Sequence, residues 1–214
     1  MTVASRGPAA PLRPDRFAVV LDLGERGLLV GLYILLVVRL QPSLASAPFN
    51  GLLILAETVV VGFVVFRRQT STITKDPTDW LLALSGTLPP LFFHAGGGHL
   101  IASGLAGGLM VTGILIQVSA KFSLRRSFGI AAANRGVKMG GPYVMVRHPM
   151  YLGYAITWLG FLSINALWVN LALALFAAAM QVARILVEER LLSADPAYRG
   201  YMARVRHRII PGFF

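Results

Sequence analysis

The stretch Trp168–Val187, with the sequence WVNLALALFAAAMQVARILV, carries one charged residue, Arg184. An α-helix needs about 20 apolar residues to cross the hydrocarbon core of a bilayer. A helix that is hydrophobic on all sides must be surrounded by lipid or buried in a large core. The stretch therefore predicts a membrane-spanning helix near the C-terminal end of the chain.

The composition of the whole chain agrees with a membrane location. Of its 214 residues, 56% are hydrophobic and 14% are charged, whereas about 25% of the residues of an average soluble domain are charged. A soluble core of this length cannot hide so much apolar surface behind so few charges. The chain has no cysteine, which excludes disulfides, thiolate catalysis and cysteine-based metal sites.

Other hydrophobic stretches precede Trp168, and the sequence predicts an all-α, polytopic transmembrane helix bundle of about six spans, with five as the alternative. Asp22, Glu25 and Arg26 weaken the first stretch. Pro89-Pro90 breaks the third, which predicts a kinked or re-entrant helix there. The basic, proline-containing residues 1–16 predict a flexible tail without chemistry. The predicted spans cover residues 17–40, 49–66, 80–95, 99–118, 150–166 and 168–187.

The formal net charge of +11 predicts the orientation of these spans. Cytoplasmic loops retain positive charge, and a six-span arrangement places 18 of the 20 lysines and arginines on one side. Both termini are therefore expected to be cytoplasmic, and residues 119–148 and 188–214 are expected to face each other there. Such an excess could also indicate nucleic acid, but its distribution favours membrane lipids as partners and argues against nucleic acid.

The first of these polar segments leads into the sequence GGPYVMVRHPMYLG at Gly140–Gly153. Pro149 suits the first position of a helix and disfavours helical geometry at His148, so a helix is predicted to begin at Pro149. The unpaired N–H groups of such a helix start can hold an anion, with Arg147, His148 and Tyr151 beside it. The alternative is a basic anchor at the membrane interface.

The second polar cluster begins inside the last span. Arg184 and Glu188 are four residues apart and share a helix face, while Glu189 addresses a different neighbour. An intrahelical ion pair and a functional site both explain this pattern. Charges at the end of a span are costly unless they are paired or functional, and the sequence leaves the two alternatives open.

The C-terminal tail is predicted to form an amphipathic helix. Asp195-Pro196 provides an N-cap and a first-turn proline, and Ile209-Ile210-Pro211 is expected to end the helix. The apolar face is expected to lie on the membrane surface, and the tail is expected to fold back as a lid over residues 135–148. That face consists of Tyr198, Tyr201, Met202 and Val205.

Two further groups of residues receive structural rather than chemical interpretations. Small residues in the fourth stretch are expected to let helix backbones approach closely in lipid. His94 and His99 are expected to be polar loop residues rather than metal ligands, because no carboxylate accompanies them, and no metal site is predicted. The small residues are Ser103, Gly104, Gly107, Gly108 and Gly113.

Together, the motifs of the C-terminal half resemble the isoprenylcysteine carboxyl methyltransferase family and its phospholipid N-methyltransferase relatives. The resemblance covers roughly residues 120–214 and combines several elements in one order. These are Gly-Pro-Tyr143, Arg147-His-Pro-Met-Tyr-Leu-Gly153, Glu188-Glu189 with Leu192, Tyr198, Tyr201 and Arg-x-Arg-x-Ile-Ile-Pro211. The resemblance divides the chain into the tail 1–16, N-terminal transmembrane helices 17–118 and a methyltransferase-like catalytic region 119–214.

The resemblance implies an integral membrane methyltransferase with S-adenosylmethionine as cofactor, bound on the cytoplasmic side between the last two spans and the tail. The match is loosest at Arg135-Gly-Val-Lys-Met-Gly140, where the family has His-x-Leu-Val-Thr-Ser. Arg184 corresponds to a substrate-binding residue, and the candidate catalytic residues are Arg184, Arg147 and Glu189. The implied cofactor-binding residues are Arg135, Gly136, Val137, Lys138, Tyr143, His148, Pro149, Met150, Tyr151 and Glu188.

The expected acceptor is a lipid-like or membrane-partitioning molecule, in which a carboxylate is favoured and an amine or thiol is an alternative. An amine would need a base, for which Glu189 and His148 are the candidates. An NADPH-dependent membrane reductase of the sterol type is the second hypothesis, although Glu188-Glu189 suits a 2′-phosphate poorly. A non-catalytic scaffold or small transporter is the third. The expected location is a bacterial inner membrane.

Overall fold

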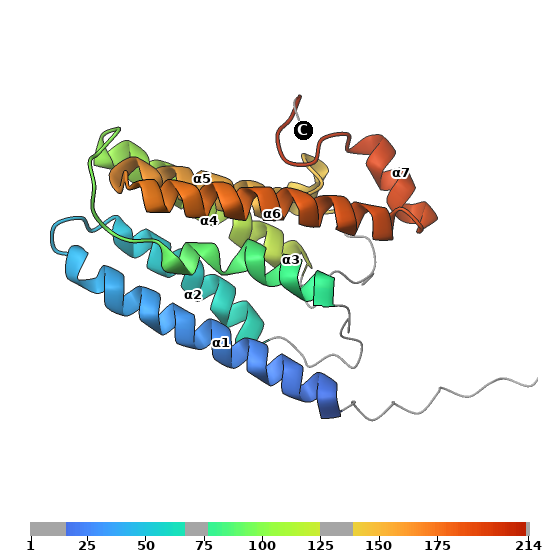
Figure 1. Cartoon of the computed structure of the whole chain (residues 1–214). Helices are drawn as coiled ribbons and strands as arrows, with labels where there is room; N and C mark the ends of the chain where they lie inside the picture. Colours follow the sequence, from blue (N-terminus) through green and yellow to red (C-terminus); the bar gives the residue numbers. More distant parts are fainter. Residues whose placement is uncertain (1–15, 67–76, 125–138, 213–214) are drawn as a thin grey trace, which may run out of the picture.

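The computed structural model describes residues 16–66, 77–124 and 139–212. This part of the chain contains α-helices and short 3₁₀ helices but no extended strand, so the expected all-α class is confirmed. Helices α1 to α6 lie side by side along a common direction, and α7 packs at one end (Figure 1). The α-helices are α1 Arg16–Leu40, α2 Asn50–Phe66, α3 Pro77–Thr87, α4 Ser103–Leu124, α5 Pro149–Ile164, α6 Trp168–Leu192 and α7 Pro196–Arg204.

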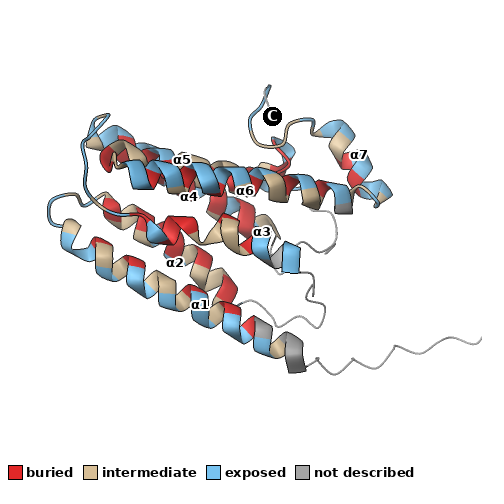
Figure 2. Cartoon of the chain, in the orientation of Figure 1, coloured by how far each residue is buried: buried red, intermediate tan, exposed pale blue. Residues whose placement is uncertain are grey.

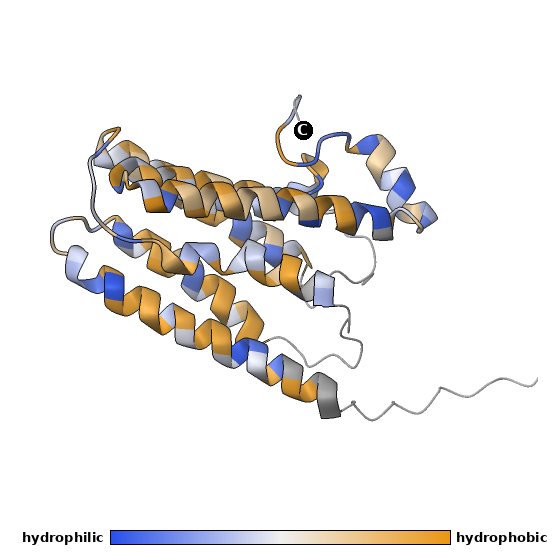
Figure 3. Cartoon of the chain, in the orientation of Figure 1, coloured by the Kyte–Doolittle hydropathy of each residue, from blue (hydrophilic) through white to orange (hydrophobic). Residues whose placement is uncertain are grey.

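Two of these helices are long and apolar enough to cross a bilayer. They are α4 and α6, while α2 and α5 are shorter apolar helices of 17 and 16 residues. The outward side of α6 exposes large apolar side chains (Figures 2 and 3). Lipid would cover this surface, whereas exposing its apolar side chains to water would cost free energy. The six-span count remains a prediction. The exposed residues of α6 include Leu171, Leu175, Phe176 and Leu186.

The third predicted span is interrupted at its prolines. Helix α3 ends at Thr87 and is followed by the 3₁₀ helix η2 at Pro89–Phe92. Proline lacks the N–H of an α-helical hydrogen bond, and its ring clashes with the preceding turn. The predicted break is therefore confirmed, and the α-helical part of this stretch ends at Thr87. The 11 residues of α3 rise about 16 Å, roughly half of the bilayer core.

Asparagine side chains hold the chain after η2 against the ends of neighbouring helices. Asn165 donates to Asn50 Oδ1 over 2.7 Å and accepts from the backbone N–H of Gly96 over 3.0 Å. Asn170 accepts from the backbone N–H of His94 over 2.9 Å and donates to its carbonyl over 2.8 Å. His94 thus lies in a loop, as predicted, and is fixed there through its backbone.

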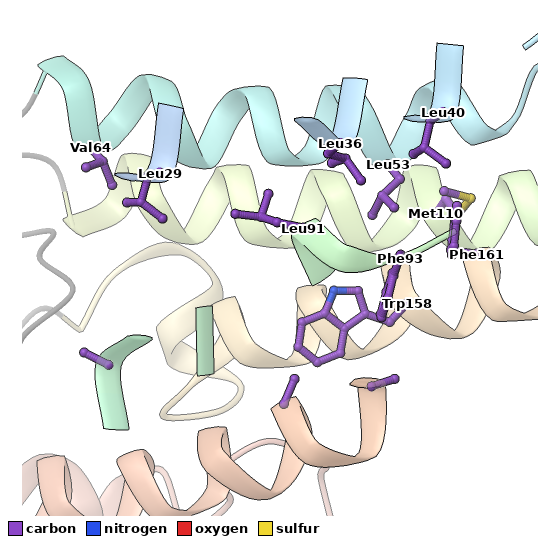
Figure 4. Packing of buried hydrophobic residues seen from close by; sticks show 13 residues of the cluster. Leu29, Leu36, Leu40, Leu53, Val64, Leu91, Phe93, Met110, Trp158 and Phe161 are labelled. Carbon is purple, nitrogen blue, oxygen red and sulfur yellow. The ribbon is translucent and has the colours of Figure 1, made fainter. Parts of the chain in front are cut away.

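The apolar core runs through the middle of the bundle and joins the N-terminal helices to α4 and α5 (Figure 4). Phe93, which follows η2, stacks on Phe161 of α5 with ring centroids 5.4 Å apart and meets Trp158 edge-on at 6.3 Å. All three rings are buried. Aromatic packing of this kind fixes the irregular segment after η2 against α5.

Helices α4 and α5 form the most extensive helix pair in the described structure. Glycines let their backbones touch, because a Cβ atom on Gly153 would lie 2.7 Å from the backbone of Gln117 and one on Gly160 would lie 2.6 Å from the carbonyl of Ala106. Gly113 faces α5 in the same way, while Gly107 packs against Phe49. The close helix approach expected of Gly113 is therefore confirmed, whereas Gly107 makes room for the ring of Phe49.

The same role is wrong for Gly104 and Gly108. A Cβ atom added at either position would have no neighbour within 4 Å, so neither glycine is needed for a close approach within the described structure. Gly108 and Gly113 are thus a matched pair on one helix, one facing open space and one facing α5.

We expect Gly113→Val to lower the melting temperature of the detergent-solubilised protein. Its side chain would overlap Thr157 and the Gly153 carbonyl, at a cost of at least about 1–3 kcal/mol. Gly108→Val should leave the melting temperature unchanged. Differential scanning fluorimetry on the two variants measures the difference, and equal losses in both would contradict this packing.

Candidate functional site

Four charged or titratable side chains meet where α5 begins and α6 ends, and we call them the tail clamp. They are Arg147, His148, Glu189 and Arg208. Arg147 binds Glu189 through Nε at 2.7 Å and through a second guanidinium nitrogen at 3.3 Å. Arg208 Nε donates to the other Glu189 oxygen over 2.8 Å, and His148 Nε2 lies 3.1 Å from the first. Glu189 is 4% exposed, so its charge is neutralised inside the protein.

The tail clamp also holds the backbone of the C-terminal tail. Arg147 donates from one terminal nitrogen to the carbonyls of Val205 and Arg206 over 2.9 and 2.8 Å. The backbone N–H groups of Arg147 and His148 donate to the carbonyls of His207 and Arg208. The tail therefore folds back over residues 143–148, and this part of the predicted lid is confirmed.

Helix α5 begins at Pro149 and α7 has Asp195 as its N-cap, as the sequence predicts. The Asp195 side chain accepts from the N–H of Ala197 over 2.8 Å. The predicted end of the tail helix is wrong, because α7 stops at Arg204 and not at Ile209. The carbonyls of Val205 and Arg206 turn instead to Arg147.

The apolar face of α7 packs on protein, which corrects the expectation that it lies on the membrane surface. Tyr198 and Tyr201 are buried and form a cluster with Ala120 of α4 and with Tyr143. Tyr201 donates its hydroxyl hydrogen to the carbonyl of Tyr143 over 2.8 Å. Burial raises the pKa of Tyr201 to about 12, so this hydroxyl keeps its proton at neutral pH.

A cavity lies between the N-terminal helices and the α5–α6 pair, starting one turn beyond the tail clamp. The space between its walls is about 460 Å³, part of it open to the surroundings. Apolar and aromatic side chains dominate its wall, and Arg184 contributes a positive charge. Its lining residues are Glu57, Val60, Gly86, Thr87, Pro90, Met150, Tyr151, Tyr154, Trp158, Gln181 and Arg184.

Aromatic rings form a continuous row from the tail clamp along this cavity. The ring of Tyr151 lies 5.8 Å from that of His148 and 6.3 Å from that of Tyr154, which stacks on Trp158 at 6.2 Å. The guanidinium of Arg184 lies 5.8 Å from the Tyr151 ring centroid, a cation–π contact. The row connects the polar end of α5 to the apolar core.

The structure divides the residues predicted from the sequence into two groups. Met150, Tyr151 and Arg184 line the cavity, whereas Arg147, His148 and Glu189 form the tail clamp. Pro149 is buried at the start of α5 and connects the two groups. Arg135, Gly136, Val137 and Lys138 lie outside the described residues.

Tyr143 and Glu188 lie between these groups. Burial, and next the negative charge of Glu188, raise the pKa of Tyr143 well above its usual value. Glu188 is half-buried on α6, one turn beyond Arg184. Its carboxylate is thus available beside the aromatic row.

The predicted anion site at the start of α5 receives no support from the geometry. The N–H groups of Arg147 and His148 already donate to tail carbonyls, and proline has no N–H. The guanidinium of Arg147 likewise donates hydrogen bonds to Glu189 and to a carbonyl of the tail. Both residues therefore position the tail in this structure.

The sequence did not lead us to expect that the N-terminal half forms part of the cavity wall, in particular through Glu57. Glu57 is the one charge between residues 49 and 66, a predicted span, and an ionisable residue inside a membrane segment marks a functional candidate by default. This signal was available in the sequence. The residues that line the cavity together with Glu57 could not be predicted in this way, because they come from three other helices and η2.

Comparison with known proteins finds a family match for one segment of the chain. Residues 97–195, a segment that includes α4, α5 and α6, match the family of phospholipid methyltransferases. No curated protein matches the chain. This segment, slightly less than half of the chain, is similar to phospholipid methyltransferases, as the motifs suggested. The match supports a membrane methyltransferase and gives no support to the reductase hypothesis.

Loss of the Glu189 charge should release the tail. We expect Glu189→Gln to speed amide hydrogen exchange at Arg147 and His148, whose N–H groups donate to the tail carbonyls, at least tenfold and to lower the melting temperature, because Arg147 would remain buried without a counter-charge. Arg190→Gln changes the exposed neighbour and should leave exchange unchanged. Unaltered protection of the Arg147 and His148 amides in Glu189→Gln would show that the tail does not depend on this carboxylate.

Proposed function

We propose that this protein transfers a methyl group from S-adenosylmethionine to a lipid-like or membrane-partitioning acceptor. The observation that carries the proposal is the cavity whose wall is formed by the family segment at Met150, Tyr151 and Arg184. It lies next to a buried ionic clamp that closes the polar end of the bundle. A reaction between a polar cofactor and an apolar acceptor needs such a junction.

The residues beside the clamp fit the chemistry of the cofactor. Its ammonium and ribose groups need a carboxylate, which Glu188 provides, and its adenine needs aromatic or apolar walls, which Tyr143, Met150 and Tyr151 provide. Arg135 to Lys138 are proposed contacts by resemblance alone. When bound, the cofactor supplies a methyl group on a positively charged sulfur.

The chain's own part in this reaction is positioning and exclusion of water. Displacement at a methyl group needs the nucleophile about 3–3.5 Å away and in line. The tail, held by Arg147 and Glu189, covers the polar end of α5, and the aromatic row keeps the acceptor side apolar. Glu189 accepts from two arginines and lies beside His148, so we assign it a positioning role rather than that of a base.

Arg184 is the residue that we propose to bind the acceptor. A guanidinium binds a carboxylate through two parallel hydrogen bonds and can aim one oxygen at the methyl group. A carboxylate acceptor is therefore favoured, with an amine or thiol as alternatives. The one-sided basic charge also supports a bacterial inner-membrane location with both termini in the cytoplasm.

Cofactor binding is the first test. Purified protein in detergent should bind S-adenosylhomocysteine saturably in isothermal titration calorimetry. Glu188→Ala should weaken this binding at least tenfold, because a charge-assisted hydrogen bond contributes about 1.5–3 kcal/mol. Arg190→Ala, two residues further along α6, should bind like the unchanged protein. Absence of saturable binding to the unchanged protein would refute the proposed function.

A further inference from the structure

A buried pair of opposite charges lies beside the cavity, and one member of it precedes the segment that matches the methyltransferase family. Glu57 of α2 lines the cavity and is 6% exposed, and Lys121 of α4 is fully buried. The two side chains interact electrostatically. Glu57 lies before the matched residues 97–195, so the N-terminal helices contribute this carboxyl group.

The surroundings of Lys121 show that its charge is held in place. Its Nζ donates to Gln117 Oε1 over 2.9 Å and lies 4.9 Å from the ring centroid of Tyr154. Gln117 in turn donates to Thr157 over 3.4 Å. Lys121 is absent from the cavity wall, whereas Glu57 is part of it. The carboxyl group, and not the lysine, thus belongs to the cavity wall.

Burying such a pair is expensive in lipid and in a protein interior. An apolar acceptor without a polar group would be held equally well by an apolar side chain at position 57. The oxygens of Glu57 are, in contrast, suited to accept hydrogen bonds from a ligand. The carboxyl group lies among Tyr154, Trp158 and Arg184 in the cavity lining.

We infer that Glu57 is a specificity-determining residue, which selects an acceptor with a hydrogen-bond-donating group, an ammonium or a hydroxyl, in this cavity. The inference rests on the proposed function and names the chemistry of its acceptor side. Arg184 provides the positive group of the cavity and Glu57 the negative one. Arg184 would bind the carboxylate of the favoured acceptor, while Glu57 would bind a donor group carried by the same molecule.

The test uses Trp158, which lies in the cavity wall, as an internal reporter. Trp80→Phe and Trp168→Phe leave it as the only tryptophan of the chain, which has three. The full-length variant in dodecyl maltoside is titrated with dodecylamine, dodecanol and dodecanoic acid, which share a chain length and differ in the head group. Trp158 fluorescence reports the binding of each probe, so the effect of losing Glu57 is measured separately for each head group.

Glu57→Gln should weaken dodecylamine binding about tenfold, as expected for loss of a hydrogen bond to a charged group, and should leave dodecanoic acid unchanged or tighter. Thr58→Val is the matched control. Its hydroxyl bonds to Ile54 and Tyr33, and it is absent from the cavity wall. This control should not alter the binding of any probe.

Loss of Glu57 alone leaves Lys121 buried without its counter-charge, so the variant could fail to fold. The double variant Glu57→Gln with Lys121→Met removes both charges and should show the same selective loss of dodecylamine binding. An equal effect of the double variant on the binding of all three probes would overturn the inference. Calorimetry with S-adenosylhomocysteine on the same samples tests the proposed function separately.

Discussion

The carboxylate of Glu189 is the group on which the geometry of the site depends. It ends the long apolar helix α6 with a negative charge that is buried in protein, and such a charge must be compensated. Arg147 and Arg208 bind it from the start of α5 and from the tail, with His148 beside it. One carboxylate thereby joins three segments that are far apart in the sequence.

Charges are fewer deeper in the bundle, and those that are buried there must be compensated in the same way. Glu57 and Lys121 interact electrostatically across α2 and α4, and Arg184 lies against the ring of Tyr151. Each of these charges in the described site therefore has a partner on another element. The N-terminal helices contribute one of them to the cavity, so they are part of the proposed site and not only its membrane anchor.

Much of the helical framework could be predicted from local sequence. Pro149 and Asp195 mark helix starts because their effects are confined to one turn, and Pro89-Pro90 breaks the third stretch for a similarly local reason. The end of α7 could not be predicted, because Arg147, nearly sixty residues earlier, takes the carbonyls that would have continued it. The burial of Tyr198 and Tyr201 could not be predicted either, because it also depends on partners that are distant in the sequence.

The sequence by itself determined the all-α class, the family motifs and the identity of most charged residues in the site. Those features depend on composition and on short spacings along one helix. Only the tertiary structure separated Arg147 and Glu189, which hold the tail, from Arg184, which lines the cavity, and brought Glu57 to the same wall. A side chain's role here is decided by which distant partner neutralises it in a medium of low polarity, and no local pattern records that partner.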